Sequence, residues 1–202
     1  MSQQINTFIQ LQVKNRNRAT VLFRAVLVIP IAILAASFDG YSSSRSRVMG
    51  IFMNPSGVFM IPVILTLLFL GVYPSYVLQF NRAIVGLSLR ISSYFLLLTD
   101  EYPSIEANEQ IGVEFPEIEG GTTLSRGLPL VKWLLAIPLY IVGAIYGVYA
   151  FMLTVLAWFT ILFTGEYPEW CAAGVIGTLS YWNRVYGYAF VLVTDEYPSF
   201  SL

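Results

Sequence analysis

Residues 71–104 read GVYPSYVLQFNRAIVGLSLRISSYFLLLTDEYPS, and residues 165–199 read GEYPEWCAAGVIGTLSYWNRVYGYAFVLVTDEYPS. With one inserted residue, the two stretches align throughout and end on the same TDEYPS string. Upstream, RAVLVIP ending at Pro30 resembles KWLLAIP ending at Pro138, which sets Arg24 opposite Lys132. Self-similarity of this kind marks a repeated structural unit. The sequence therefore predicts two tandem repeats.

The composition predicts that these repeats lie in a membrane. Of 202 residues, 56% are hydrophobic and 11% are charged, and the mean hydropathy is +0.68. Soluble domains are less apolar and more highly charged. A formal net charge of -1 argues against a nucleic-acid partner, because duplex binding requires a basic surface. The polar first 18 residues show no removable signal peptide, and the lone Cys171 cannot form an internal disulfide.

We expect an all-α integral membrane protein in which each repeat has two transmembrane helices and one amphipathic interfacial helix. The first repeat is expected at 1–104, with transmembrane helices near 19–37 and 57–72 and the amphipathic helix at 75–98. An acidic linker follows at 105–126. The second repeat is expected at 127–202, with transmembrane helices near 128–145 and 149–164 and the amphipathic helix at 169–193.

The turn between the two transmembrane helices of the second repeat is the least obvious part of this division. As one helix, residues 128–164 would be roughly 55 Å long, too long for a hydrocarbon core of about 30 Å. We therefore expect the chain to turn back near Gly143 to Ala150. In a continuous helix, small residues would instead form a stripe on which another helix could pack, namely Gly143, Gly147, Ala150, Thr154 and Ala157.

Each amphipathic helix carries one stripe of polar or small residues at helical spacing. The stripes are Gln79, Arg82, Gly86, Arg90 and Ser93 in the first copy, and Ala173, Gly177, Ser180, Arg184 and Gly187 in the second. Such a helix could lie in the headgroup plane, or it could span with its stripe facing a protein interior. The distribution of Lys and Arg favours four spans and two interfacial helices, with both termini cytoplasmic. A six-span arrangement would split the positive residues less cleanly.

Two short segments alternate apolar and polar residues, as β-strands do. They are FIQLQV near the N-terminus and QIGVEF in the linker, and each precedes one repeat. If both are strands, they could pair with each other.

The residue types present argue against an enzyme. The chain has no histidine, no glycine-rich phosphate loop and no Gly-x-Ser-x-Gly elbow. With a single cysteine, the usual zinc, haem and Cys/His arrangements are excluded as well. We therefore expect no catalytic residues, no metal and no cofactor.

The candidate site residues are tyrosines, acids and arginines that could contact a partner or lipid headgroups. They are Arg82, Arg90, Arg184, Asp100, Glu101, Asp195, Glu196, Tyr73, Tyr102, Tyr167 and Tyr197. Each tyrosine precedes a proline, which ends one helix and can open the next. The structural interpretation of these tyrosines and acids is an ordinary membrane boundary, and the functional one is a cation or partner site. The arginines could extend to lipid headgroups, or they could mark a polar path inside the membrane.

The strings AWFTILFTGEYPEW (157–170) and YGYAFVLVTDEYPSFSL (186–202) resemble the bacterial membrane proteins classed as domain of unknown function 4389. Residues 71–104 resemble the same pattern. The resemblance implies a bacterial inner-membrane protein that carries two tandem copies of this domain. It implies no activity and no site.

Two functions lead from the sequence, and an enzyme that acts on lipid is a third and weaker alternative. The first is a non-catalytic scaffold or accessory subunit of a larger membrane complex, with lipids and other membrane protein subunits, or further copies of itself, as partners. The second is a homo-oligomeric transporter or channel for a small solute, ion or lipid, since duplicated units are common in such folds.

Overall fold

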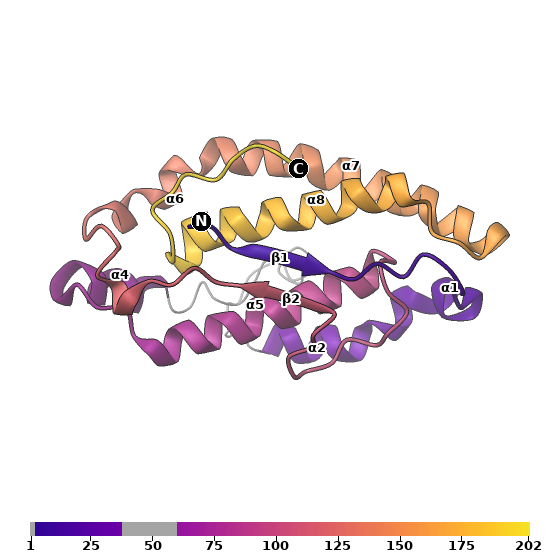
Figure 1. Ribbon diagram of the computed structural model, residues 1–202, viewed down its shortest axis with the longest axis horizontal. Coiled ribbons are helices and arrows are strands. Elements are labelled where there is room, and N and C mark those ends of the chain that lie inside the picture. The colour runs from indigo at the N-terminus through magenta and orange to yellow at the C-terminus, as the bar shows by residue number, and fades with distance from the viewer. Residues whose placement is uncertain (1–2, 38–59) are drawn as a thin grey trace.

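The computed structural model describes residues 3–37 and 60–202, and it is mostly helical with one small sheet (Figure 1). Along the chain the elements are β1 (Asn6–Ile9), α1 (Arg18–Leu27), α2 (Ile29–Ser37), α4 (Met60–Leu70), α5 (Ser75–Phe95), β2 (Ile111–Glu114), η2 (Glu119–Gly121), η3 (Leu128–Leu130), α6 (Lys132–Leu135), α7 (Ile137–Thr164), α8 (Glu169–Tyr186) and the π-helical turn η4 (Gly187–Val191). The expected connection between the first two transmembrane helices, together with residues 57–59, lies outside the described residues.

The two strands pair with each other, although β1 begins two residues before the expected stretch FIQLQV and ends at Ile9, so that only Phe8 and Ile9 of that stretch are in the strand. β1 runs antiparallel to β2, with Asn6 opposite Glu114 and Ile9 opposite Ile111. A strand from the N-terminus is thereby joined to a strand from the linker. The pairing brings the starts of the two halves of the chain together in the middle of the molecule (Figure 1).

The sheet lies against α5 and α8, the two helices that the sequence predicts to be amphipathic. On α8, Asn183 donates a hydrogen bond to the Thr7 hydroxyl of β1 (2.8 Å). On α5, Gly86 lies beside Val113 of β2, and the Arg82 guanidinium lies 5.7 Å from the ring of Phe115. β2 and the residues that follow it therefore lie along the polar stripe of α5, in which Gly86 and Arg90 are buried and Arg82 remains exposed.

The expected hairpin at residues 128–164 is wrong, because α7 is one continuous helix that passes through Gly143 to Ala150 without a turn. Its first residue with left-handed backbone is Gly165 (φ 80°), which caps the end of the helix. Small residues serve a different purpose inside α7. A Cβ atom at position 143 would lie 2.7 Å from the Trp182 ring of α8, so glycine there permits close packing of the two helices.

The first half of the chain forms its apolar helices in separate pieces. α1 and α2 are separated only by Val28, near Pro30, which has no N–H to donate within a helix. α4 covers the part of the second expected transmembrane helix that the structure describes. α2 packs on α5 through a cluster that includes Val28, Ile31 and Leu87.

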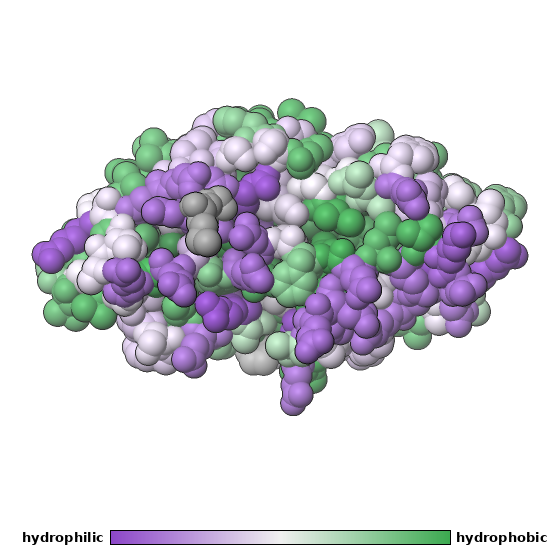
Figure 2. All heavy atoms as spheres, in the orientation of Figure 1, coloured by the Kyte–Doolittle hydropathy of each residue, from purple (hydrophilic) through white to green (hydrophobic). Residues whose placement is uncertain are grey.

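Within the described residues, two helical segments are long and apolar enough to cross a membrane, namely Arg18–Ser37 and Ile137–Thr164. Only 28% of the most apolar stretch in each is buried, whereas the core helix of a soluble protein is mostly buried. Figure 2 shows hydrophobic residues along the rim formed by α7 and at the end formed by α4, and hydrophilic residues across the lower part of this face. The apolar helices therefore keep much of their surface outside the protein core.

Candidate functional site

The first of two ionic clusters joins α1 to the TDEYP segment that follows α5. Arg24 is buried, and its guanidinium donates to the Thr99 carbonyl (2.6 Å), to the Tyr94 carbonyl (2.9 Å) and to the Asp100 carboxylate. The same guanidinium lies 4.3 Å from the centre of the Tyr94 ring. A buried guanidinium needs such partners, because an unpaired charge in this environment is strongly destabilising.

A second buried arginine shares the same carboxylate. Arg16 lies 3.3 Å from Asp100 and also donates to the backbone carbonyl of Leu97, a residue with left-handed backbone (φ 67°). Burial lowers the pKa of the Arg16 guanidinium to about 10, although the Asp100 carboxylate acts in the opposite direction. Arg16 therefore remains charged at neutral pH and neutralises Asp100 together with Arg24.

The second ionic cluster joins α6 to the TDEYP segment at the end of the chain. The side chain of Lys132 is fully buried, and its ammonium group lies 2.6 Å from the Asp195 carboxylate and donates to the Thr194 carbonyl (2.7 Å). It also lies 5.3 Å from the centre of the Tyr188 ring. The cation, the tyrosine ring, the threonine carbonyl and the aspartate are thus the same chemical set as around Arg24.

Each aspartate also binds a backbone N–H that lies seven residues before its cation in the sequence. Asp100 accepts from Asn17 (2.8 Å), and Asp195 accepts from Ser125 (2.6 Å). Burial by itself would raise the pKa of the Asp195 carboxyl, but the hydrogen bonds from Lys132 and Ser125 outweigh it and lower that pKa. Both carboxylates are fully engaged in holding the fold together.

The acid that follows each aspartate is exposed. Glu101 and Glu196 donate their backbone N–H groups to the hydroxyls of Thr99 (3.1 Å) and Thr194 (3.0 Å). The Glu196 carboxylate accepts a hydrogen bond from the backbone of Gln3 (2.9 Å). The expected pairs of acids therefore separate into one carboxylate bound to a buried cation and one that lies at the surface.

The four tyrosines of the Tyr-Pro steps also separate into two kinds. Tyr73 and Tyr167 are buried, whereas Tyr102 and Tyr197 are exposed and lie edge-on to the rings of Tyr94 and Tyr188. The Tyr73 hydroxyl donates to the Val191 carbonyl (2.8 Å), and burial raises the pKa of this hydroxyl to about 12. The two buried tyrosines are part of the core, and only the two exposed ones could meet a partner.

The three candidate arginines lie in different environments. Arg90 is buried and donates to the linker carbonyls of Ser104 (2.9 Å) and Ile105 (3.1 Å). Arg82 is exposed on the face of α5 near Phe115. The structure therefore does not bring these two arginines together with Arg184, which lies on α8.

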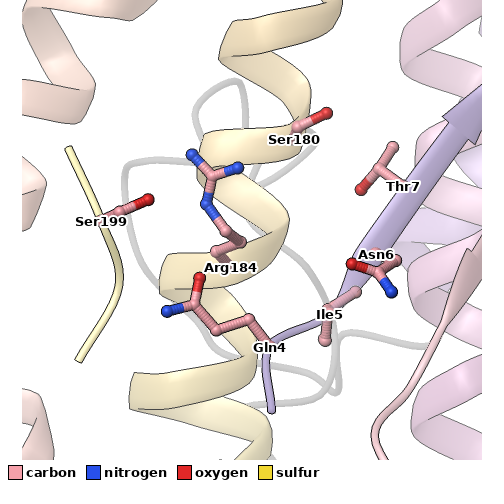
Figure 3. A pocket seen from close by; sticks show the side chains of 7 residues that line it. All are labelled: Gln4, Ile5, Asn6, Thr7, Ser180, Arg184 and Ser199. Atoms are coloured by element: carbon pink, nitrogen blue, oxygen red, sulfur yellow. The ribbon is translucent and has the colours of Figure 1, made fainter. Parts of the chain in front are cut away.

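Arg184 borders an open polar hollow between α8, the start of β1 and the C-terminal tail (Figure 3). The hollow is lined by Gln4, Ile5, Asn6, Thr7, Ser180, Arg184 and Ser199. The guanidinium donates to the Ser201 carbonyl of the tail, so part of its hydrogen-bonding capacity is already used. Polar side chains in the hollow could bind water or a small polar group, but they contain no acid–base pair.

Arg24, Lys132 and Arg16 are central to the two clusters, although the sequence does not single them out as site residues. A signal for two of them was present, since the repeat alignment sets Arg24 opposite Lys132 and Asp100 opposite Asp195. Two aligned cations and two aligned acids in an apolar chain predict ion pairs. Arg16 gives no such signal, because the corresponding residue of the second half is Leu124.

The described residues hold no group of three or more His, Cys, Asp or Glu side chains that could bind a metal. Cys171 is buried within the cluster formed by α1, α7 and α8, and burial raises the pKa of its thiol. A thiol with a raised pKa is a poor nucleophile.

A comparison with protein-family models confirms the expected family. Residues 129–201 match the family described as Domain of unknown function (DUF4389). These residues contain α7, α8 and the Lys132–Asp195 cluster. No curated protein and no solved structure matches the chain.

Proposed function

The chain belongs, through residues 129–201, to the family described as Domain of unknown function (DUF4389), and we propose that it acts in a membrane as a non-catalytic scaffold or accessory subunit. One observation carries the proposal. Within the described residues, the buried arginine and lysine side chains are bound to aspartates or to backbone carbonyls, as in the Arg24–Asp100 and Lys132–Asp195 clusters. Groups engaged in this way stabilise a fold and are not available to a substrate.

We also propose that the scaffold consists of two copies of the domain, of which residues 129–201 are the second. The hydrogen bonds of the two halves correspond to each other. Asn17 precedes Arg24 by the same number of residues as Ser125 precedes Lys132, and both backbone N–H groups bind the aspartate of their own cluster. This agreement extends the sequence alignment to the atoms that the aligned residues contact.

The two proposed copies exchange contacts. Tyr73, after α4, donates its backbone N–H to the Gly120 carbonyl in the linker (2.8 Å). Tyr167, after α7, donates its backbone N–H to the Val13 carbonyl near the N-terminus (2.9 Å). Each copy thus binds the segment that leads into the other, which would make the tandem pair one folding unit.

The linker is the surface that we assign to a protein partner. Small residues of α7 are not available for this purpose, since Gly143, Ala150 and Ala157 are buried against neighbouring helices. The linker instead exposes five carboxylates, those of Glu106, Glu109, Glu114, Glu117 and Glu119. Five like charges on one segment favour a partner with a basic surface.

Purification from native membranes in a mild detergent, through a C-terminal tag, tests the scaffold proposal. We expect one protein to remain bound at constant stoichiometry. Replacement of the five linker glutamates by glutamine should release that partner while the chain itself stays in the membrane fraction. Replacement of the exposed Glu166 and Glu169, which lie outside the linker, by glutamine is the matched control and should leave the partner bound. A clean monomer from the unaltered chain would contradict the proposal.

A transporter or channel is not favoured by any contact in the described residues. Arg24, within the first long apolar segment, and Lys132, before the second, are both bound to aspartates. A conduction path would need polar groups that face an open cavity. Flux of an ion, solute or lipid in liposomes that contain only this protein would reverse this preference.

A further inference from the structure

The sheet, α8 and α7 form successive layers, and the contacts of α8 define their order. On α8, Asn183 contacts Thr7 of β1, and Gly187 lies beside Ile5 at the start of that strand. Tyr181, two residues from Asn183, donates instead to the Leu139 carbonyl of α7 (2.9 Å). Residues two apart lie about 200° apart around a helix. The strand and α7 therefore lie on opposite faces of α8.

α7 has two stripes, also on opposite faces. The buried stripe lies toward the rest of the protein and consists of Leu139, Gly143, Ala150, Leu153, Ala157 and Ile161. The exposed stripe is entirely apolar and consists of Ile141, Ile145, Val148, Met152, Val155, Phe159 and Phe163. At about 100° per residue, the two stripes are half a turn apart. The layers in this half of the protein are therefore, in order, the sheet, α8, α7 and an exposed apolar surface.

The first half has the same kind of order. α5 contacts β2 through Gly86 and packs on α2 through a different face that includes Leu87 and Ile91. The outer surface of α1, α2 and α4 is again apolar and exposed, through Leu22, Val26, Ile29, Ile33, Ile61, Leu65 and Phe69. Figure 1 shows α7 along one long side of the molecule, α5 and α2 along the other, and α1 and α4 at opposite ends, with the strands between the two long sides and roughly parallel to α7.

We propose that the protein lies in the plane of one leaflet and does not make the expected multi-pass crossing. The exposed apolar stripes lie in the acyl chains, and the sheet lies in water. The inference rests on the proposed membrane role. β1 runs alongside α8, and α8 runs alongside α7, so a membrane-spanning α7 would carry the strands to the same depth. Exposed polar residues such as Asn6, Gln10 and Glu114, and the free edges of the sheet, would then lie within the hydrocarbon region.

The length of α7 agrees with this orientation. Its 28 residues form a helix about 42 Å long, whereas a hydrocarbon core is about 30 Å thick. A helix that crosses the membrane must match this thickness or tilt, but a helix in the plane of a leaflet has no such limit. The turn expected in this segment is then unnecessary.

Exposed arginines lie at both ends of the molecule. They favour a leaflet of anionic lipids as the partner that covers the apolar face. Arg18, at the start of α1, lies close to Gly165 at the end of α7. Arg126, before η3, lies close to Gly71 at the end of α4. An apolar surface bordered by cations binds headgroups and acyl chains together.

Labelling of single cysteines with a membrane-impermeant maleimide tests the orientation of the full chain. In a Cys171→Ala background, the positions are Gly127→Cys before α7, Glu166→Cys after α7 and Glu114→Cys on the sheet. All three native residues are exposed, and a Cβ atom at position 127 meets nothing within 4 Å. The variants are compared in right-side-out and inverted vesicles from the expression host.

The proposal predicts that all three positions are labelled in the same vesicle orientation and protected in the other. Labelling of Gly127→Cys and Glu166→Cys from opposite sides would overturn it, as would protection of either position in both orientations. A carbonate wash separates this failure from failure of the proposed function. Chain that stays in the pellet but is labelled from two sides contradicts only the in-plane orientation, whereas chain released to the supernatant contradicts the membrane role as well.

Discussion

The two halves of the chain make the same contact with different cations. In the first half, the guanidinium of Arg24 binds two backbone carbonyls and Asp100, and Arg16 binds the same carboxylate. In the second half, the single ammonium group of Lys132 binds one carbonyl and Asp195. The planar fork of arginine can reach several acceptors at once, whereas lysine acts as a compact charge. The number of buried cations around each aspartate, two at Asp100 and one at Asp195, therefore decides how costly its loss should be.

The halves also differ in the continuity of their apolar helices. α7 extends unbroken from Ile137 to Thr164, whereas α2 and α4 are separate helices. In the alignment of the two repeats, Arg24 and its counterpart Lys132 are 108 residues apart in the sequence. Gly71 and its counterpart Gly165 are only 94 residues apart. The first half thus contains additional residues at the place where α7 is continuous. An insertion into one copy explains this difference better than a hairpin in both.

Replacement of Asp100 by asparagine should have the largest effect on stability. The change leaves two buried guanidiniums, those of Arg16 and Arg24, without a counter-charge. Breaking a buried ion pair in this way costs about 3–5 kcal/mol. Thermal or denaturant unfolding in detergent micelles, followed by circular dichroism, measures the loss. Glu101→Gln at the exposed neighbour is the control, and an equal effect of the two substitutions would contradict the assignment.

Replacement of Asp195 by asparagine should be less destabilising, because only one cation loses its partner. Lys132 is nevertheless fully buried, so a loss of about 3 kcal/mol is expected. The same unfolding measurement applies, with Glu196→Gln as the control. If Asp195→Asn costs more than Asp100→Asn, the number of cations bound to each aspartate does not govern the stability of the two clusters.

Two glycine substitutions test the continuity of α7. Gly143→Ala should destabilise the protein by about 1–3 kcal/mol through a clash with the Trp182 ring. Gly147→Ala, where a Cβ atom meets nothing within 4 Å, should be neutral or stabilise it by about 0.5–1 kcal/mol, the difference between alanine and glycine in a helix. Unfolding midpoints of the two variants are compared with that of the unaltered chain. A marked loss at Gly147→Ala would indicate a turn at this position.

The pH dependence of stability should show a smaller effect that comes from the second cluster. The pKa of Asp195 is lower in the folded protein than in the unfolded chain, so its contribution is present above the unfolded pKa of about 3.9. That contribution decreases as the pH falls through the folded pKa. A series of unfolding midpoints at pH values from neutral down to that range should show a decrease that is weaker in Asp195→Asn. Identical profiles for the two proteins would exclude this origin.

The local features of the fold could be predicted from the sequence. Alternation in FIQLQV and QIGVEF predicted both strands, and the confirmed pairing followed from placing one strand before each half. The helix at 75–98 was recognisable from its polar stripe and corresponds to α5. These features depend on residues close together in the sequence, which a single chain displays directly.

Features that depend on contacts between distant segments could not be predicted in the same way. The turn at Gly143 to Ala150 was inferred from a length limit that applies only to a helix crossing the bilayer. Small residues at these positions fit a turn as well as a tight helix contact, and only the position of Trp182 distinguishes the two. The tyrosines of the Tyr-Pro steps look alike in sequence, yet Tyr73 is buried and Tyr102 is exposed because different segments cover them.

A spin-label scan along α7 tests most directly whether one unbroken helix lies between α8 and lipid. Single labels are placed in turn from position 139 to position 163 in a Cys171→Ala chain reconstituted into liposomes, and oxygen accessibility is measured at each. The account predicts a helical period through the whole scan, with maxima at Ile141, Ile145, Met152 and Phe159. Loss of the period, or a rise in water accessibility, between 143 and 150 would contradict it.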